Sequence, residues 1–325
     1  MWRIRGSIFF VLSGFVINLG YGNKFAVVEK KKYFIFMKKR LQKIYPLYFI
    51  TMVIMFVEAI RNVSTFEDTI RNCVLFLLSI FMLQTLVPIQ SIAQVFNGAA
   101  WFMSCLFVLY LCTPYLLKWN EKIRNNIKST LLCGVGVIGI YEILILFVVP
   151  LVDEKYRIGL VYCSPYMRSF YCVFGILLGN IYIILKDKIN NCSVDKRIIA
   201  TCLEVISVIS FIFTYIIVPN LEMKWSYLVF MLVSGMIIII FAFEQGKVSD
   251  FLKKGFNTNL GNISFEFYLI HYPLIFLGWP IIVKYDLGVS RYFEWGIVFF
   301  VLSIIMAQIA HCISKKYKEL LLQKK

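Results

Sequence analysis

The chain has 325 residues, of which 60% are hydrophobic and 17% aromatic, and its mean hydropathy is +0.78. This composition excludes an ordinary soluble globular domain, in which apolar residues are far less frequent. The formal net charge of +16 does not indicate a nucleic-acid partner, because the basic residues lie almost entirely between the apolar segments, as expected for the inner loops of a membrane protein.

Apolar segments long enough to cross a membrane recur along the whole chain. A hydrocarbon core of about 30 Å is crossed by roughly 20 helical residues. The sequence predicts such segments at 7–22, 44–60, 71–88, 99–118, 131–150, 166–185, 198–218, 225–243, 264–283 and 293–313. The predicted fold is therefore all-α, a polytopic transmembrane helical bundle with about 9–10 membrane segments that forms a single domain over residues 1–325.

The distribution of lysine and arginine predicts the orientation of the bundle. The connections at 118–128, 186–197 and 244–259 and the tail at 314–325 are rich in lysine and should be cytoplasmic, as should the basic cluster at 24–43. Three apparent spans separate this cluster from the connection at 118–128, and an odd number cannot return the chain to the same side. Either one of 44–60, 71–88 and 99–118 is broken, re-entrant or interfacial, or the loops depart from the charge rule.

A basic segment, FMKKRLQKIYPLYF, covers residues 36–49. Lys39 and Lys43 share one face of a helix because they are four residues apart, and Arg40 stands beside them. Tyr45 and a proline follow directly and open the next span. Such a cationic face can hold the phosphates of a coenzyme or the anionic headgroups of lipids.

The glycines at 134, 136 and 139 match the G-x-G-x-x-G pattern of dinucleotide-binding loops. They lie inside an apolar span, where no free helix N-terminus is available to hold a pyrophosphate, so we reject a nucleotide site. Small residues in membrane helices allow neighbouring helices to approach closely. We expect close helix packing here and at Gly175 and Gly179.

His271 is an ionisable group at membrane depth, where such groups are costly and need a function or a specific partner. Tyr268 precedes it by three residues and therefore lies beside it on a helix. A neutral imidazole can accept a proton from a hydroxyl, so His271 is a candidate general base. Alternatively, it is a structural histidine bonded to Tyr268 or to a carbonyl freed by Pro273.

Other polar and aromatic residues also have two interpretations. Arg168, at the mouth of its span, can contact an anionic substrate or extend to the lipid headgroups. Trp101 can equally be a membrane-interface anchor. His311, beside Lys315 and Lys316, is expected to be an ordinary interface residue. The nine cysteines include no C-x-x-C pair, so the sequence predicts small buried hydrophobic residues and no metal site.

Five sequence blocks follow one another along the chain: IFFVLSGFVI, FMKKRLQKIYPLYF, AAWFMSCLFVLYLCTPYLL, YMRSFYCVFGILLGN and LGNISFEFYLIHYPLI. Together they resemble the membrane acyltransferase family called acyltransferase 3, over essentially the whole chain. The resemblance implies transfer of an acyl group, most often acetyl, from cytoplasmic acyl-CoA to a sugar hydroxyl of a surface or lipid-linked glycan. It further implies a bacterial plasma membrane protein with membrane lipids and a glycan acceptor as partners, and no metal.

The resemblance also assigns residues to the site. Ser13 and Gly14 match the helix that lines the active site, and Arg40 with Lys43 match a basic cytoplasmic motif. Later blocks match at Trp101, Arg168, Ser264, Glu266, Tyr268 and His271. We therefore expect His271 to be catalytic and the following residues to bind substrate or acyl donor: Ser13, Gly14, Lys39, Arg40, Lys43, Tyr45, Trp101, Arg168, Glu266 and Tyr268.

One feature of the family is not seen in this sequence. In the family, a helix carrying an arginine and a histidine precedes the FFVLSGF block, whereas only residues 1–7 precede it here. The resemblance therefore implies a chain that is shortened at its N-terminus, or inactive, or one in which His271 substitutes as the base. Other functional hypotheses are a glycan transporter or flippase and a non-catalytic membrane component that binds a glycan.

Overall fold

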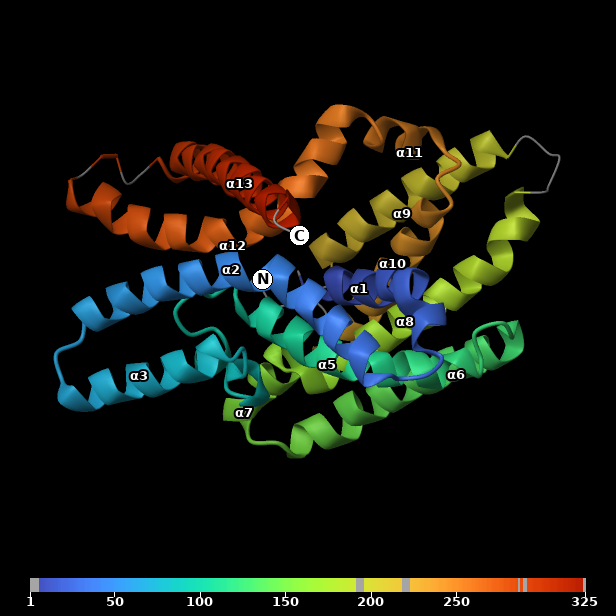
Figure 1. Cartoon of the computed structure of the whole chain (residues 1–325), viewed down its shortest axis with the longest axis horizontal. Helices are drawn as coiled ribbons and strands as arrows, with labels where there is room; N and C mark the ends of the chain where they lie inside the picture. Colours follow the sequence, from blue (N-terminus) through green and yellow to red (C-terminus); the bar gives the residue numbers. More distant parts are fainter. Residues whose placement is uncertain (1–5, 191–195, 218–222, 286, 289–290, 324–325) are drawn as a thin grey trace. The chain divides into compact units, whose positions relative to one another are not determined.

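The computed structural model describes residues 6–190, 196–217, 223–285, 287–288 and 291–323, and these residues are almost entirely helical (Figure 1). The helices are α1 Ser7–Tyr21, α2 Lys30–Arg61, α3 Phe66–Ile80, α4 Gln90–Ala93, α5 Trp101–Glu121, α6 Ile127–Ile143, α7 Glu154–Ile158, α8 Pro165–Asn190, α9 Arg197–Ile217, α10 Met223–Ala242, α11 Lys247–Leu252, α12 Gly255–Lys284 and α13 Tyr292–Gln323.

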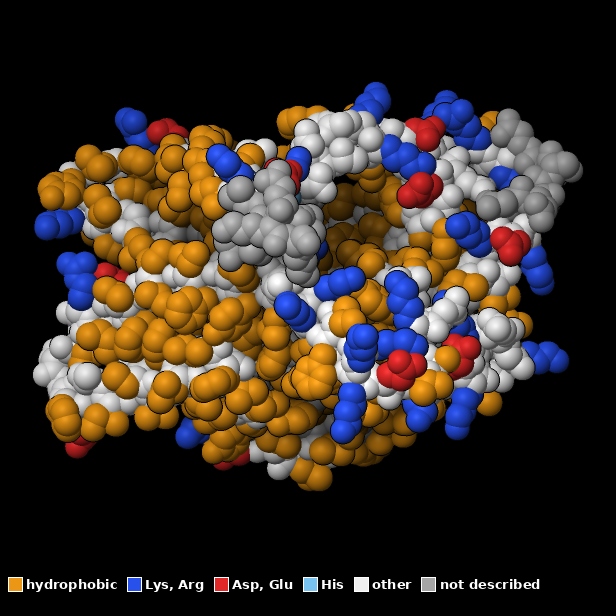
Figure 2. All heavy atoms as spheres, in the orientation of Figure 1, with side chains coloured by type: hydrophobic (Ala, Val, Ile, Leu, Met, Phe, Trp, Pro, Cys, Tyr) orange, Lys and Arg blue, Asp and Glu red, His pale blue; other side chains and the backbone are white. Residues whose placement is uncertain are grey.

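The helices confirm the prediction of an all-α polytopic membrane bundle. Within the described ranges, 8 helical segments are long and apolar enough to cross a membrane, and α10 contributes a shorter apolar helix over Ser226–Ala242. The chain is therefore an integral membrane protein. Apolar side chains cover much of the surface over α3 and the later turns of α2, whereas lysine and arginine gather where α2 begins (Figure 2).

Two predicted spans in the N-terminal third of the chain differ from the structure, and α12 and α13 extend beyond the spans predicted at 264–283 and 293–313. The segment at 71–88 is not one helix, because α3 ends at Ile80 and residues 81–100 contain turns and short helical pieces. Met82 and Phe96 there have φ of 56° and 59°, a left-handed conformation that interrupts a right-handed helix. The break removes one of the three apparent spans between the basic cluster at 24–43 and the connection at 118–128. Both basic segments can then lie on the same side of the membrane. The span predicted at 44–60 begins earlier, because α2 starts at Lys30 and continues through Pro46.

The described chain divides into two compact units. Unit 1 comprises Met1–Arg40, Thr85–Ala93 and Cys105–Lys253, and unit 2 comprises Leu41–Gln84, Gln94–Ser104 and Lys254–Lys325. The chain passes between the units within α2 and again within α5. The single domain expected over 1–325 stays a prediction.

Unit 1 is built on a close crossing of α1 and α8. A Cβ at Gly14 would overlap the backbone carbonyl of Cys172, and a Cβ at Gly175 would overlap that of Val11. Each glycine thus admits the backbone of the other helix, which confirms the packing expected at Gly175.

Other glycines in unit 1 divide into packed and open positions. Gly179 is also closely packed, against the side chain of Asn18. By contrast, a Cβ at Gly134, Gly136 or Gly139 would have no described atom outside its own helix within 4 Å. The packing expected at these three positions is therefore wrong, because this part of α6 faces away from the described neighbouring helices.

Three buried asparagines join α1, α5 and α8 inside unit 1. The Asn18 amide donates to the Ile176 carbonyl at 2.7 Å and to Asn180 Oδ1 at 2.8 Å. Asn120 and Asn180 donate to each other at 3.0 and 2.7 Å. All three side chains are fully buried. Amide groups that satisfy one another in this way hold apolar helices together where the hydrophobic effect acts weakly.

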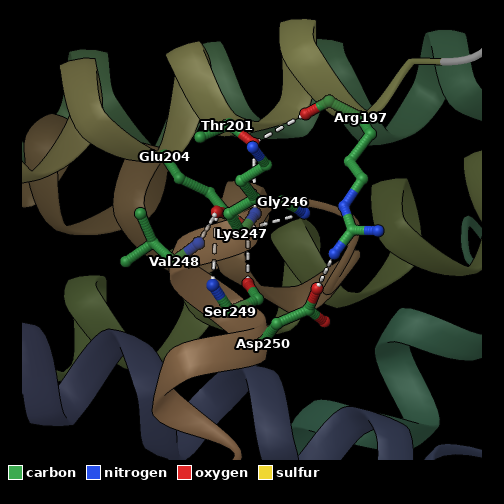
Figure 3. A network of polar contacts seen from close by, with 8 residues as sticks. All are labelled: Arg197, Thr201, Glu204, Gly246, Lys247, Val248, Ser249 and Asp250. Atoms are coloured by element: carbon green, nitrogen blue, oxygen red, sulfur yellow. Dashed lines mark hydrogen bonds and ion pairs between the residues drawn. The ribbon is translucent and has the colours of Figure 1, made fainter.

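A carboxylate from α9 caps the short helix α11 (Figure 3). Glu204 accepts the backbone N–H of Gly246 and of Val248 at 3.0 Å and that of Ser249 at 3.2 Å, and it also binds the Ser249 hydroxyl. These donors have no partner within the helix at its N-terminus, and the negative charge complements the helix dipole. Glu204 thereby fixes the connection after α10 to α9.

Unit 2 contains the antiparallel pair α12 and α13 and the later part of α2 with α3. The rings of Phe56 and Phe76 stack with centroids 4.0 Å apart. The Tyr48 hydroxyl donates to the Ser79 carbonyl at 2.7 Å and accepts from the Gln84 amide at 2.9 Å. Tyr48 thus joins α2 to the last turn of α3, where the Ser79 carbonyl also accepts the backbone N–H of Met82 at 2.9 Å.

Candidate functional site

Arg40 occupies an aromatic cage in unit 1. Its guanidinium carbon lies 5.0 Å from the ring centroid of Tyr21 and 5.4 Å from those of Phe36 and Tyr110. These distances are within the range of cation–π attraction. The Arg40 Nε is buried and has no hydrogen-bond partner among the described residues. A planar guanidinium that is held in place with an unused donor is suited to a phosphate or carboxylate.

Further cations accompany Arg40. Lys24 lies with its Nζ 5.0 Å from the centroid of the Tyr21 ring. Lys39 and Lys43 are exposed on α2, one turn apart. The basic motif predicted from the sequence is therefore one continuous helical face. Tyr45 follows on the same helix, where its ring stacks on that of Phe49 at 5.8 Å.

Arg168 is fully buried in unit 1, in the first turns of α8. Its Nε donates to the Tyr162 carbonyl at 2.9 Å, and its Nη1 donates to the Ser7 hydroxyl at 3.0 Å. The rings of Tyr171 and Tyr227 lie 5.0 and 5.7 Å from its guanidinium carbon. The interpretation as an interfacial arginine is wrong, because the side chain points into the helix bundle and not toward headgroups. Its predicted contact with substrate stays a prediction.

Ser13 and Gly14 lie together in α1. Ser13 is half-buried, and Gly14 is buried against α8. The structure gives Gly14 a packing function. The participation of both residues in substrate binding, which the resemblance implies, stays a prediction.

Unit 2 contains an aromatic cluster assembled from two distant sequence blocks. Trp101 and Phe102 begin α5, and the ring of Phe102 meets that of Tyr268 edge-on at 5.6 Å. The Tyr268 ring lies 5.8 Å from the His271 imidazole. Trp101 is only 3% exposed, which does not fit a membrane-interface anchor. The fold therefore brings the tryptophan and histidine blocks together, as the resemblance implies for one site.

His271 interacts chiefly with its own helix. Its Nδ1 lies 3.3 Å from the carbonyl of Phe267, one turn earlier, and the two rings stack at 5.9 Å. The imidazole is thus bonded to a carbonyl, as in the structural alternative, but not to the carbonyl freed by Pro273. That carbonyl belongs to Leu269 and accepts from the Asn97 amide at 3.1 Å. Ser264 is similar, since its hydroxyl donates to the Gly261 carbonyl at 2.7 Å. With Nδ1 turned to a carbonyl, Nε2 of His271 can still accept a proton.

Glu266 and His311 form a pair that the sequence does not predict. Glu266 Oε1 on α12 and His311 Nδ1 on α13 are 3.0 Å apart. The expectation of an ordinary interface residue at His311 is wrong, because the imidazole has a specific carboxylate partner. The only sequence signal for the pair is that both groups are ionisable and stand inside apolar segments.

The described residues contain no group of three or more His, Cys, Asp or Glu side chains that could hold a metal. Unit 1 contains three cations beside aromatic rings, Lys24, Arg40 and Arg168. Unit 2 contains the Trp101 cluster, His271 and the Glu266–His311 pair. The first set is cationic and suited to anions, whereas the second contains the imidazoles and is suited to proton transfer.

Comparisons with known proteins identify the family to which this helical chain belongs. The family model described as an acyltransferase domain matches residues 3–312. The chain belongs to this family, acyltransferase 3.

Part of the chain is also similar to a protein named as an acyltransferase. The chain is 28% identical over 137 residues to acyltransferase MdmB of Streptomyces mycarofaciens, a stretch that covers 41% of this chain and 33% of the relative. The match thus spans about a third of the relative's length. No solved structure matches the chain.

Proposed function

We propose that the chain is an integral membrane acyltransferase that moves an acyl group, in particular acetyl, from acyl-CoA to a hydroxyl of a cell-surface or lipid-linked glycan. The observation that carries the proposal is the caged Arg40 on a basic helical face, within a chain whose family match runs through both units. The relative's printed name, an acyltransferase, supports the same class of reaction.

Acyl-CoA is the co-substrate in this proposal, and its phosphates are the ligands for the basic face. Arg40 offers a buried Nε with no described partner, while Lys39 and Lys43 offer exposed ammonium groups on the same helix. Arginine binds phosphate through paired donors, and lysine acts as a point charge. The positive-inside pattern predicts that this face and the C-terminus are cytoplasmic, where the donor is available, and the proposed membrane is the bacterial plasma membrane.

The chemistry requires a proton acceptor and a stabilised oxyanion. A base removes the proton of the sugar hydroxyl while its oxygen attacks the thioester carbonyl, and donors around the carbonyl oxygen stabilise the developing charge. The carbon–sulfur bond then breaks and the thiolate takes a proton. His271 is the base that the sequence predicts. Tyr268 provides an aromatic ring and a hydroxyl beside it for the acceptor, and Trp101 contacts Phe102, whose ring meets that of Tyr268. Membrane lipids surround the bundle.

Labelled acetyl-CoA, supplied to membranes that contain the chain together with cell-envelope glycan, tests the proposal. We expect the glycan to become labelled. Mild alkali should then release the label from the glycan, because it hydrolyses an ester. Replacing Arg40 with alanine should raise the KM for acetyl-CoA roughly 10- to 100-fold, as for loss of a charge-assisted contact. Lys38→Ala, which changes an exposed lysine on another face of α2, is the matched control.

Two results would count against the proposal. Movement of glycan across the membrane without any ester product would instead indicate a transporter or flippase. Glycan binding without either movement or ester formation by the wild-type chain would indicate a non-catalytic component.

A further inference from the structure

The Glu266–His311 pair joins two membrane helices by a direct contact between a carboxylate and an imidazole. The side chain of Glu266 is 12% exposed and that of His311 is 34% exposed, with Oε1 and Nδ1 3.0 Å apart. The carboxylate is therefore enclosed, while part of the imidazole remains accessible. This is the arrangement needed when one group orients and the other reacts.

The contact fixes which imidazole nitrogen is free. An ionised carboxylate can only accept a hydrogen bond, so a favourable contact requires the proton on His311 Nδ1. In the neutral imidazole the lone pair then lies on Nε2, on the opposite side of the ring from Glu266. When Nε2 accepts a proton, the resulting imidazolium is stabilised by the adjacent carboxylate.

A purely structural explanation accounts less well for the pair. Ionisable side chains within apolar helices are costly, and Glu266 Oε2 is buried with no hydrogen-bond partner among the described residues. A clamp between α12 and α13 would be more stable if both carboxylate oxygens were satisfied. Incompletely satisfied buried polar groups of this kind are typical of functional sites.

His271 lacks such a partner. Its Nδ1 contact is with a carbonyl of its own helix at 3.3 Å, which carries no full charge to stabilise an imidazolium. Of the two histidines in the sequence, His311 is the one that has a carboxylate at hydrogen-bond distance. His311 also lies one turn before Lys315, at the end of α13 that the charge pattern assigns to the cytoplasm, where acyl-CoA arrives.

We propose that His311, oriented by Glu266, is the general base of the acyl transfer; this inference depends on the proposed function. The acceptor O–H bond breaks and its proton moves to Nε2 while the oxygen forms a bond to the thioester carbon. The carbon–sulfur bond then breaks, and the imidazolium returns the proton to the thiolate, which leaves as free CoA. Atoms and charge balance without a further reactant.

The test compares His311→Asn, Glu266→Gln and His271→Asn in the purified full chain, with acetyl-CoA as donor and envelope glycan as acceptor. Asparagine at 311 keeps a donor near the Nδ1 position and so keeps the contact with Glu266, but it cannot accept a proton. We expect His311→Asn to lower kcat by roughly 10²- to 10⁴-fold, with KM and the unfolding temperature little changed. Glu266→Gln should lower kcat at least about tenfold. Gln308→Ala, at an exposed position on α13, is the control variant and should leave kcat unchanged.

The results of this experiment distinguish a failure of His311 as the base from a failure of the proposed acyl transfer. An active wild type with an inactive, folded His311→Asn supports the base. A wild-type kcat in His311→Asn or Glu266→Gln, or a larger loss in His271→Asn, overturns the inference and leaves the acyl transfer intact. If His311→Asn does not fold, Glu266→Gln decides the question in the same way. No transfer by the wild type overturns both.

Discussion

Gly14 of α1 lies directly against the backbone carbonyl of Cys172 in α8, with no space for even a methyl group between them. Gly175 makes the reciprocal contact with Val11, so the two helices approach backbone to backbone. Close approach of this kind increases van der Waals contact between membrane helices, where water does not drive association. The crossing therefore depends on the absence of a side chain at two positions.

Replacing Gly14 with valine should destabilise unit 1. The added atoms would overlap a backbone carbonyl that cannot move without shifting α8, and overpacking of this kind costs about 1–3 kcal/mol. Thermal unfolding of the detergent-solubilised protein measures the effect. Gly20→Ala is the control on the same helix, because a Cβ at Gly20 meets nothing within 4 Å. Equal unfolding temperatures for the two variants would contradict the close crossing.

The asparagine cluster should contribute to the stability of unit 1. Asn180→Ala removes the partner of both Asn18 and Asn120 and leaves their buried amides without it. We expect a loss of about 1–2 kcal/mol, the range for polar contacts between membrane helices. The double variant with Asn18→Ala should lose less than the sum of the two single losses, since the residues share hydrogen bonds. Strict additivity in chemical unfolding would exclude such coupling.

Arg168→Lys tests whether the buried arginine supports the fold or binds substrate. Lysine keeps the charge but has neither the planar fork that donates to the Tyr162 carbonyl and the Ser7 hydroxyl nor the flat face that stacks on the tyrosines. We expect a lower unfolding temperature, equivalent to about 1–3 kcal/mol, with the KM for either substrate little changed. A raised KM at unchanged stability would instead support the substrate contact predicted from the sequence.

Removal of the Glu204 cap should loosen the segment that contains α11. Glu204→Ala leaves the N–H groups of Gly246, Val248 and Ser249 without their partner, at an expected cost of about 2 kcal/mol. Lys247 and Lys253 in this segment offer trypsin sites, so cleavage there should become faster.

The ion pair next to the cap supplies the control for this prediction. Arg197→Ala breaks the pair with Asp250, whose side chains are 57% and 50% exposed. An exposed pair contributes at most about 1 kcal/mol, so cleavage should change little. If trypsin cut the Arg197 variant as fast as the Glu204 variant, the cap would not be the main constraint.

The helices and their order could be predicted from the sequence because apolar length and charge distribution determine insertion locally. The break in 71–88 was signalled only by the odd count of spans, since left-handed backbone at Met82 has no reliable sequence pattern. The basic face at Arg40 is local to one helix, so the sequence predicts it directly. The contact of Glu266 with His311 joins residues 45 apart, and that of Asn18 with Asn180 joins residues 162 apart. Such pairs are formed by tertiary packing, so they can be identified only from the structure.

Acyl transfer from acyl-CoA to a glycan hydroxyl is measured as release of free CoA from acetyl-CoA by the purified chain in lipid nanodiscs, with and without the acceptor glycan. We expect CoA release that depends on the acceptor and equals the amount of ester formed. Arg40→Ala should need a higher acetyl-CoA concentration for the same rate. Absence of acceptor-dependent CoA release from the folded wild-type chain would show that the chain does not catalyse this transfer.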